Sequence, residues 1–427
     1  MEANTPYIPT SENTWCASPW TEIHIDQGGE MVFCCQAKHV VGNVNENSIK
    51  EIFNGREYKK ARLETLSNIW PKGCELCERA EKVSNRSMRY QQQESYESNL
   101  NIIQPDINKD YKIQKFKIDF SNACNLRCTM CSPHRSTGWF KDAKMLMDSE
   151  LTRKEISRAV RITEKVKGEP YTIETYGIPS SVIDDNLDII LDTKMIDISG
   201  GEPFYTPQFK YLVDKLVEHN YKGRLKVITN LTLLDQEYVE KLKNINTTLI
   251  VSMDATGHLY EYVRPSTPFG KYKGKDIQNK IIELKHEHGF DMAISYTPQL
   301  LNVYNIQEYV HWLQEAKIKP RHEFMFNGPV TSPRYLTIAV HPDTDYKLRL
   351  ADMLERDFGN TSRLNGVINL CRKPRDSEVI NYGPSDNHTE IENWKFFCKI
   401  TEMLDKQRKT SILNYIPQLE KYWVSNK

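Results

Sequence analysis

Three features are missing from this sequence of 427 residues, and each absence excludes a class of protein. Neither sign of charge predominates, because Lys and Arg together number 57 and Asp and Glu also number 57. No excess charge therefore favours nucleic acid or a membrane surface as a partner. No apolar run approaches the roughly 20 residues of a transmembrane helix, and the amino terminus lacks the basic-then-apolar pattern of a secretory signal. We expect a cytoplasmic protein with no nucleic-acid or membrane partner.

Cysteine is scarce only in the later part of the chain. Eight of the ten cysteines precede residue 132, and the other two, Cys371 and Cys398, are isolated. In a large chain with no export signal, such clustering favours metal ligation over disulfides. An isolated thiol is usually a small buried apolar group, which is what we expect for the two later cysteines.

The densest cluster comprises Cys124, Cys128 and Cys131, directly after an alternating polar and apolar run at 113–120. A period of two predicts a strand, so the cysteines follow on a loop. This spacing can aim three thiolates at one point, and thiolate is the ligand that iron–sulfur clusters and zinc select. Three ligands are one fewer than a closed tetrahedral site has, so the site keeps an open coordination position.

A strand followed by Cys-x3-Cys-x2-Cys resembles the signature of the radical S-adenosylmethionine (radical SAM) superfamily. The resemblance implies that the three cysteines hold a catalytic 4Fe–4S cluster whose fourth iron is chelated by the methionine part of S-adenosylmethionine. It implies reductive cleavage of that cofactor to a 5′-deoxyadenosyl radical, which abstracts hydrogen from a substrate. It also places Met130, before the third cysteine, at the cofactor site. A small zinc site and three unrelated thiols are the alternatives.

Six apolar, β-branched runs alternate with amphipathic helical stretches after residue 110. They lie at 113–120, 195–199, 225–229, 248–253, 292–297 and 323–326. This alternation predicts a parallel sheet with right-handed crossovers, which carries its chemistry at the carboxyl ends of its strands. The fold class is therefore α/β. Six units rather than eight resemble the partial (βα)6 TIM-like barrel of the radical SAM superfamily.

Gly200-Gly201-Glu202-Pro203 follows the second of these runs. Two glycines let the backbone approach a ligand closely, and a carboxylate accepts hydrogen bonds from an ammonium group. The tetrapeptide resembles the superfamily's Gly-Gly-Glu-Pro motif, and the resemblance implies that it binds the amino group of the cofactor.

Polar side chains also stand at the ends of the next two runs. Asn230 ends the third, and Ser252 and Asp254 end the fourth, where a hydroxyl and a carboxylate would suit ribose hydroxyls. The pair resembles a Ser-x-Asp of SPASM-type radical SAM enzymes, in which an arginine near the position of Arg264 pairs with the cofactor's carboxylate. The alternative for each polar residue is an ordinary strand-to-helix cap.

The amino-terminal region holds a second set of cysteines. Two alternating runs at 23–26 and 31–35, joined by Gly28-Gly29, predict a β-hairpin. Cys16, Cys34, Cys74 and Cys77 supply four thiolates, enough for a closed zinc or iron–sulfur site, and Cys35 is a fifth candidate. The pattern resembles a SPASM domain in its shorter twitch form, which implies a second, auxiliary 4Fe–4S cluster. A structural zinc site is the alternative, and the module precedes the core where in relatives it usually follows.

We therefore expect three regions: a twitch- or SPASM-like module at 1–105, a radical SAM core at 106–330 and a mostly helical region at 331–427. Within the core, 138–186 is an insertion that we interpret as a solvated pair of helices, with a substrate-covering lid as the alternative. In the last region, helices are expected at 342–356, with Pro342 at the first helical position, and at 393–406 and 411–422.

The resemblance implies a radical SAM oxidoreductase that acts on a peptide or protein side chain, with an electron donor such as flavodoxin or ferredoxin. A small metabolite or nucleotide is the alternative substrate, and a non-catalytic, zinc-stabilised binding protein on a barrel scaffold is the alternative of another class. Cys371 or Cys398 would alternatively cap the auxiliary cluster or donate hydrogen to a substrate radical.

Overall fold

The computed structural model describes residues 9–84, 87–90, 92, 105–161, 173–319, 324–326, 329–330, 332–358, 362–373 and 388–424. The chain divides into two compact units. The first unit comprises Met1–Asn122, Tyr176–Ile228 and Leu234–Thr248, and the second comprises Ala123–Thr175, Thr229–Leu233 and Leu249–Lys427. No helix in the described ranges is both long and apolar enough to cross a bilayer.

The first unit contains a mostly parallel sheet with the strand order β3-β2-β1-β4-β5-β6. Its strands are β1 (Glu22–Ile25), β2 (Glu30–Val32), β3 (Gly42–Asn43), β4 (Lys115–Asp119), β5 (Met195–Ser199) and β6 (Arg224–Thr229). β1 and β2 pair antiparallel, which confirms the expected hairpin. Gly29 adopts φ +84° in the connecting turn, a conformation that favours glycine.

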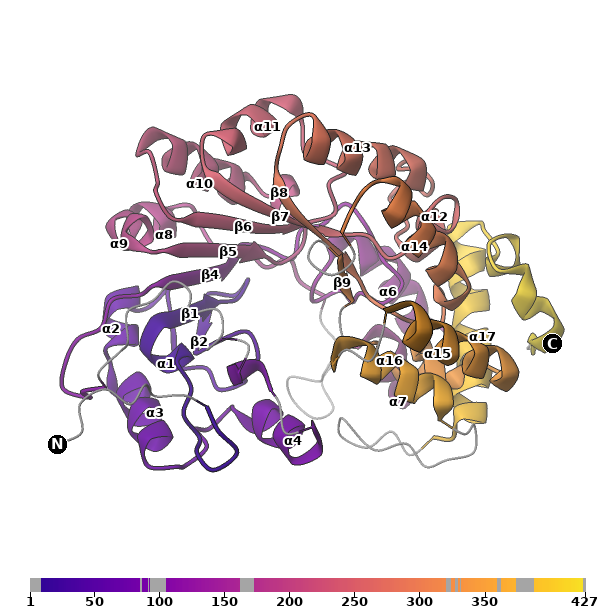
Figure 1. Cartoon of the computed structure of the whole chain (residues 1–427), viewed down its shortest axis with the longest axis horizontal. Helices are drawn as coiled ribbons and strands as arrows, with labels where there is room; N and C mark the ends of the chain where they lie inside the picture. Colours follow the sequence, from indigo (N-terminus) through magenta and orange to yellow (C-terminus); the bar gives the residue numbers. More distant parts are fainter. Residues whose placement is uncertain are drawn as a thin grey trace. The chain divides into compact units, whose positions relative to one another are not determined.

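The amino-terminal hairpin belongs to the same sheet as the strand before the three-cysteine loop. β1 pairs in parallel with β4, with Glu22 opposite Lys115 and Ile25 opposite Ile118, and β4 continues in parallel to β5 (Figure 1). A parallel partner so distant in sequence cannot be recognised from local patterns. The pairing extends the sheet beyond β4 by three strands.

The first unit also contains helices. They are α1 (Ser18–Thr21), α2 (Ile49–Phe53), α3 (Arg56–Leu66), α4 (Glu75–Ser84), α8 (Ser181–Asp184), α9 (Leu187–Asp192), α10 (Pro207–Glu218) and α11 (Gln236–Lys243). α10 and α11 lie side by side over β5 and β6 (Figure 1). Phe209, Leu212 and Leu216 of α10 are fully buried at helical spacing, and burial of such a stripe holds the helix on the sheet.

The second unit contains the part of β7 (Asn246–Ser252) from Leu249 onward, β8 (Asp291–Tyr296) and β9 (Phe324–Phe326), in that order. β8 and β9 are parallel. Helices α12 (Leu259–Val263), α13 (Gly274–His286) and α14 (Ile306–Glu315) connect or follow these strands, and α15 (Thr344–Phe358), α16 (Ser362–Arg372) and α17 (Glu390–Arg408) form the carboxyl-terminal part. Each of the six expected runs contains a strand, although Glu323 lies outside the described residues, and the α/β class with a mostly parallel sheet is confirmed.

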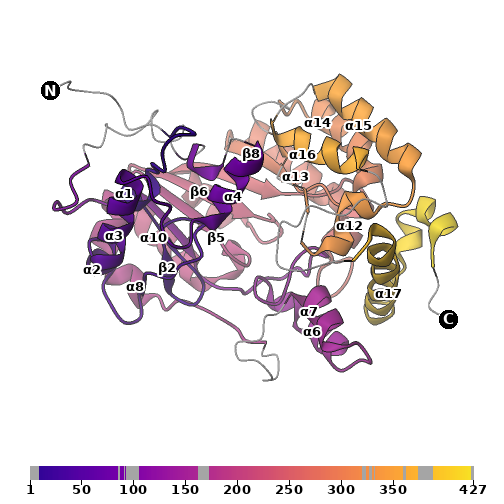
Figure 2. The same ribbon diagram turned by 90° about the horizontal axis from the view of Figure 1, so that it is seen from below.

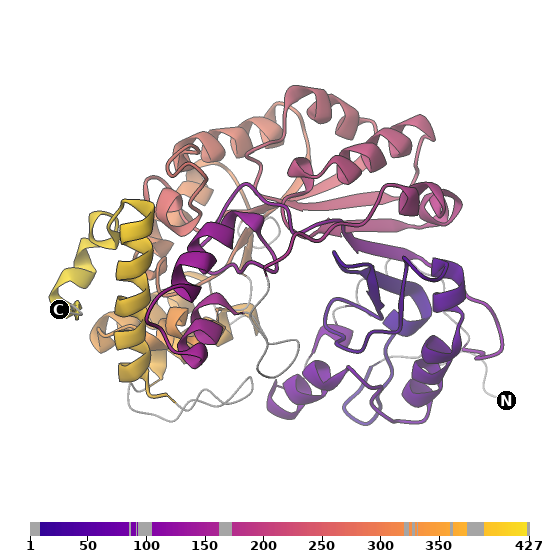
Figure 3. The same cartoon turned by 180° about the vertical axis from the view of Figure 1, so that it is seen from behind.

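Two expectations in the second unit are wrong. The insertion contains α6 (Phe140–Met147) and α7 (Arg153–Val160), but these helices are not merely solvated, because they bury one face beside α17 (Figures 2 and 3). Arg158 of α7 donates to Asn393 of α17 at 2.9 Å. The expected helix at 411–422 is instead two 3-10 segments, Ile412–Asn414 and Pro417–Tyr422, because Pro417 lacks the N–H that a continuous α-helix would use.

Candidate cofactor and metal sites

The three-cysteine loop lies wholly in the second unit and is paired to a distant backbone segment. The Arg127 N–H donates to the Pro265 carbonyl at 2.8 Å, and the Thr129 N–H donates to the Val263 carbonyl at 3.0 Å. These two bonds hold the loop against the segment that carries Arg264. The loop is thus fixed by backbone contacts on both sides of Cys128.

The thiols of this loop are partly withdrawn from solvent. Cys128 is buried, and burial raises its pKa to about 12, although the nearby Arg264 guanidinium works in the opposite direction. Burial also raises the pKa of Cys131, and there Arg161 opposes the effect. Such thiols stay protonated at neutral pH until a metal displaces the proton, and soft thiol donors on one loop fit a cluster of this kind.

Arg264 is brought to the loop by Asp254. The Arg264 Nε and Nη2 atoms lie 2.7 and 2.6 Å from Asp254 Oδ2, and Nη1 donates to Cys128 Sγ at 3.6 Å. Asp254 is fully buried, and its Oδ1 accepts the Thr297 N–H at 2.7 Å. The structure therefore brings together Asp254, Arg264 and Cys128. A direct contact of Asp254 with the cofactor's ribose stays a prediction.

Asn230 also contacts the loop. Its Nδ2 donates to Asn125 Oδ1 at 3.2 Å, while its Oδ1 accepts from the Thr232 hydroxyl at 2.6 Å. Asn125 Nδ2 in turn donates to the Thr232 hydroxyl at 2.8 Å. The three side chains form a closed ring that ties the loop to the end of β6. Asn125 and Thr232 were missed from the sequence because amides and hydroxyls in loops are common.

Met130 and Ser252 are half-buried, Ser252 at the last position of β7. The Met130 carbonyl accepts a hydrogen bond from the Arg161 guanidinium, which follows α7. Arg161 therefore brings a cation from the insertion to the third cysteine of the loop. Nothing in its local sequence distinguishes it from the surface charges around it.

The Gly-Gly-Glu-Pro turn lies in the first unit, at the carboxyl end of β5. Gly200 adopts φ +113°, and a Cβ there would lie 2.9 Å from the Ser121 carbonyl oxygen. The Gly201 N–H donates to that same oxygen at 2.8 Å. Glu202 is buried, and its Oε1 accepts the Phe204 N–H at 3.3 Å, at the start of the 3-10 segment Pro203–Tyr205. Only glycine fits the first position, as a turn built for close backbone approach requires.

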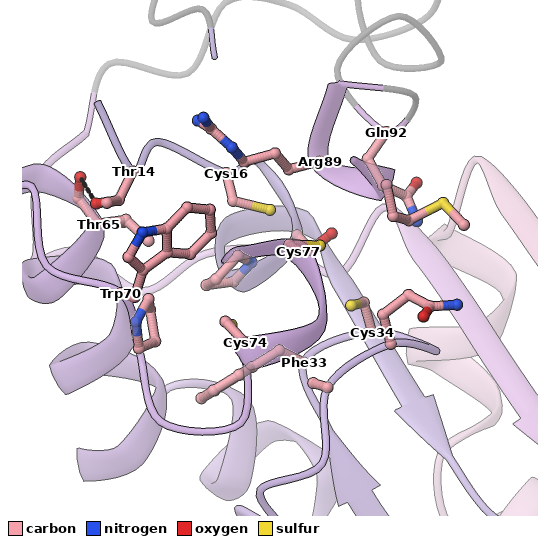
Figure 4. A pocket seen from close by; sticks show the side chains of 16 residues that line it. Thr14, Cys16, Phe33, Cys34, Thr65, Trp70, Cys74, Cys77, Arg89 and Gln92 are labelled. Atoms are coloured by element: carbon pink, nitrogen blue, oxygen red, sulfur yellow. Dashed lines mark hydrogen bonds between the residues drawn. The ribbon is translucent and has the colours of Figure 1, made fainter. Parts of the chain in front are cut away.

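The amino-terminal cysteines converge on one pocket of the first unit. The side chains of Cys16, Cys34, Cys74 and Cys77 all line it, and Figure 4 shows them arranged around the same space. The pocket has about 490 Å³ of empty volume, including the part open to solvent. Cys35 is exposed and lies outside the pocket lining, so the structure separates it from the other four.

Two chain segments that carry these cysteines are bonded to each other. The Lys38 N–H, just after Cys34, donates at 3.0 Å to the carbonyl of Gly73, just before Cys74. Gly73 adopts φ +90°, and a Cβ there would lie 2.5 Å from the His39 nitrogen. The glycine thus permits the close approach that brings Cys34 and Cys74 to one pocket.

The chemistry of these donors fits a four-thiolate site. Burial raises the pKa of Cys16 to about 11, and it also raises the pKa values of Cys34 and Cys74. Within the described ranges, no group of three or more His, Cys, Asp or Glu side chains is already spaced as metal ligands. The four thiols nevertheless line a single pocket. Both ligand sets stay predictions.

A polar row on the first unit's sheet was also missed. Lys117 Nζ lies 2.7 Å from Ser199 Oγ and 3.5 Å from Asp197 Oδ1. Asp119 accepts a hydrogen bond from Ser199 and lies 3.4 Å from His24 Nε2. These residues occupy alternate positions of β1, β4 and β5, so they share one face. The signal was present as polar residues at every second position of buried strands.

Comparison with protein families confirms both resemblances. Residues 118–316 match the radical SAM superfamily, and residues 16–78 match SPASM, an iron–sulfur cluster-binding domain. A radical SAM match implies a 4Fe–4S cluster with S-adenosylmethionine for the first region, and a SPASM match implies auxiliary iron–sulfur binding for the second. No curated protein matches the chain.

Several solved structures are similar to the chain. Native anSMEcpe with bound AdoMet is 17% identical, with 59% of this chain and 62% of that chain covered and a TM-score of 0.38. Streptococcus suis SuiB bound to S-adenosylmethionine is 15% identical, with 81% and 73% covered and a TM-score of 0.38. SuiB bound to the precursor peptide SuiA is 16% identical, with 83% and 74% covered and a TM-score of 0.36. The chain thus spans less than two thirds of anSMEcpe.

Proposed function

We propose that this chain, a member of the radical SAM superfamily with an amino-terminal SPASM domain, is an enzyme that generates a radical from S-adenosylmethionine. The cluster and the cofactor, when bound, supply reductive cleavage to methionine and a 5′-deoxyadenosyl radical that abstracts hydrogen from a substrate. The observation that supports the proposal most is the braced three-cysteine loop with the Arg264 guanidinium at Cys128 Sγ.

In this proposal Cys124, Cys128 and Cys131 hold the catalytic cluster. Arg264 then has two tasks that its fixed position permits. Its positive charge offsets the negative charge of ligated thiolates, and its remaining N–H groups can donate to the carboxylate of the cofactor. Asp254 keeps the guanidinium in place through two contacts to Oδ2.

The remaining cofactor contacts are assigned by the motifs. We propose that Gly200–Pro203, Asn230, Ser252 and Met130 contact the cofactor. Glu202 would accept hydrogen bonds from its ammonium group, because a carboxylate is the matching acceptor. Asn230 has a second role, since its amide also supports the loop through Asn125.

Cys16, Cys34, Cys74 and Cys77 are proposed to hold the auxiliary 4Fe–4S cluster, with zinc as the alternative metal. The parallel pairing of β1 with β4 supports a role for the module in the reaction, because it builds the module's hairpin onto the strand that leads to the catalytic loop. Electrons would come from a small carrier protein such as flavodoxin or ferredoxin.

The proposed substrate is a peptide or protein side chain. The support is the resemblance of residues 16–78 to the SPASM module, which accompanies radical SAM cores that modify peptides and proteins.

The test is formation of 5′-deoxyadenosine by anaerobically reconstituted protein with dithionite and S-adenosylmethionine. Cys128→Ala should abolish it. Cys371→Ala is the matched control, because it removes an isolated thiol that is also buried but lies outside the loop. Equal product from Cys128→Ala and from wild type would reject the assignment of the loop.

A further inference from the structure

The carboxyl-terminal helix α17 reaches the three-cysteine loop through a buried charged cluster. Arg408, at the last position of α17, places Nε and Nη2 2.9 and 2.8 Å from Asp142 Oδ2. Asp142 Oδ1 accepts from Arg127 Nη1 at 3.0 Å. Arg127 is the residue before Cys128, so one fully buried carboxylate links the helix to the loop.

Arg408 makes two further contacts on the same side of the loop. Its Nη2 donates to the Arg127 carbonyl at 3.4 Å. Its guanidinium carbon lies 5.5 Å from the centre of the Trp139 ring, and Trp139 Nε1 donates to the Cys128 carbonyl at 2.8 Å. Arg408 of α17 therefore supports the Arg127–Cys128 stretch in three ways: through the Asp142 carboxylate, through the Arg127 carbonyl and through the Trp139 ring.

Asp405, three residues earlier on α17, holds the segment to which the loop is paired. Its Oδ1 accepts from the Tyr262 hydroxyl at 2.9 Å, and the Tyr262 carbonyl accepts from the Thr129 hydroxyl at 3.3 Å. Its Oδ2 accepts the Ile412 N–H at 2.7 Å. Arg408 thus contacts the loop itself, and Asp405 contacts the segment to which the loop is paired.

The charge of the cluster is the second observation. Arg127 and Arg408 are both buried and share the Asp142 carboxylate, and the charge of Arg408 also acts on the Asp405 carboxylate one turn earlier on α17. Removal of one partner from a buried ion pair is costly, because it leaves the other charge uncompensated. The charges of α17, of α6 and of the loop therefore depend on one another.

From these contacts we infer that Arg408 and Asp405 are positioning residues of the radical SAM site. Through these two residues α17 holds the three-cysteine loop in place. This inference relies on the proposed function for what the loop binds. Packing of a helix against the core does not require buried polar residues. The end of α17 nevertheless carries two of them, and they are hydrogen-bonded to the loop and to its partner segment.

The first readout needs no cluster. In cluster-free full-length protein, Arg408→Met should speed amide hydrogen exchange in 124–139 by about tenfold, because the charged hydrogen bonds to Asp142 and Arg127 are lost. The exchange rate of this segment in Arg408→Lys should lie between the rates in Arg408→Met and in wild type. Lys399→Met is the control, since Lys399 lies on the same helix but pairs with Glu155 at 2.6 Å, away from the loop.

The second readout is the electron paramagnetic resonance signal of the reduced catalytic cluster with S-adenosylmethionine. The signal should shift in Arg408→Met and return toward its wild-type position in Arg408→Lys. Formation of 5′-deoxyadenosine should be about tenfold slower in Arg408→Met than in wild type. Unchanged exchange in 124–139, or acceleration shared equally by every region of the second unit, would overturn the inference. If wild type forms no 5′-deoxyadenosine, the proposed function fails, and the exchange result still decides whether α17 orders the loop.

Discussion

Glu22 of β1 lies directly opposite Lys115 of β4, and their side chains form an ion pair of 2.9 Å. Glu22 is fully buried and Lys115 nearly so. The pair joins the SPASM hairpin to the first strand of the radical SAM core. A module that precedes the core is thereby built into the core's own sheet.

Removal of one charge of this pair should destabilise the protein strongly. Glu22→Gln keeps the acceptor for Ser18 but leaves Lys115 as a buried cation without its partner, which should cost about 3 kcal/mol of unfolding free energy. Urea denaturation measures the loss. Asp192→Asn is the matched control, because Asp192 and Lys112 are paired at 2.8 Å on the surface and the loss should stay below about 1 kcal/mol. Equal losses would mean that the pair does not join the hairpin to the core.

Asp197 should make the free energy of unfolding depend on pH in the acidic range. Its burial disfavours the charged form, but Lys117 and Lys226 outweigh that effect and hold the pKa of Asp197 below its ordinary value. A depressed folded-state pKa means that the stabilisation is complete above the unfolded value of about 3.9 and is lost as pH falls below it. The stability difference between wild type and Asp197→Asn should therefore be full at about pH 5 and shrink as the pH falls below about 4. A difference that stays constant over that range would contradict the assignment.

Substitution of Gly200 tests whether the Gly-Gly-Glu-Pro turn requires glycine at its first position. Gly200→Ala adds a strained left-handed residue and a Cβ 2.9 Å from the Ser121 carbonyl, so we expect a loss of 2 kcal/mol or more, on the order of backbone strain plus a clash, and weaker S-adenosylmethionine binding by calorimetry. Gly289→Ala separates the two effects, since Gly289 also has positive φ but nothing lies within 4 Å of its Cβ position. Identical losses in both variants would show that the close approach at Gly200 is unimportant.

The amino-terminal pocket should hold its own metal. Replacement of both Cys74 and Cys77 by Ala should remove about half of the bound iron and leave cofactor cleavage without substrate intact. Cys35→Ala should leave the iron content unchanged, because Cys35 is exposed beside the pocket rather than in its lining. Loss of both clusters in the double variant would show that the two sites are not independent.

Local patterns were sufficient for much of the fold. The run expected at 195–199 coincides with β5, because the alternation that predicts a strand depends on neighbouring residues alone. The capping box of Ser48 and Glu51 at the start of α2 is local in the same way. The cysteine spacings and the Gly-Gly-Glu-Pro motif likewise pointed to the candidate sites from short stretches.

What the sequence could not indicate depends on distant partners. Asp142, Arg161 and Arg408 look like surface charges of mixed-charge segments, yet each contacts the three-cysteine loop or a residue bonded to it. The parallel pairing of β1 with β4 brings together segments about ninety residues apart, with Glu22 opposite Lys115. Such contacts become visible only when the chain is folded.

The most direct test of the account is the iron and sulfide content of anaerobically purified protein, measured together with 5′-deoxyadenosine formation, in wild type and in the Cys124→Ala, Cys128→Ala, Cys131→Ala triple variant. The account predicts about eight irons and product in wild type, and about four irons and no product in the variant. About four irons with product in wild type would keep the enzyme and remove the auxiliary cluster, with zinc as its replacement. Zinc in place of iron and no product in wild type would contradict the central claim.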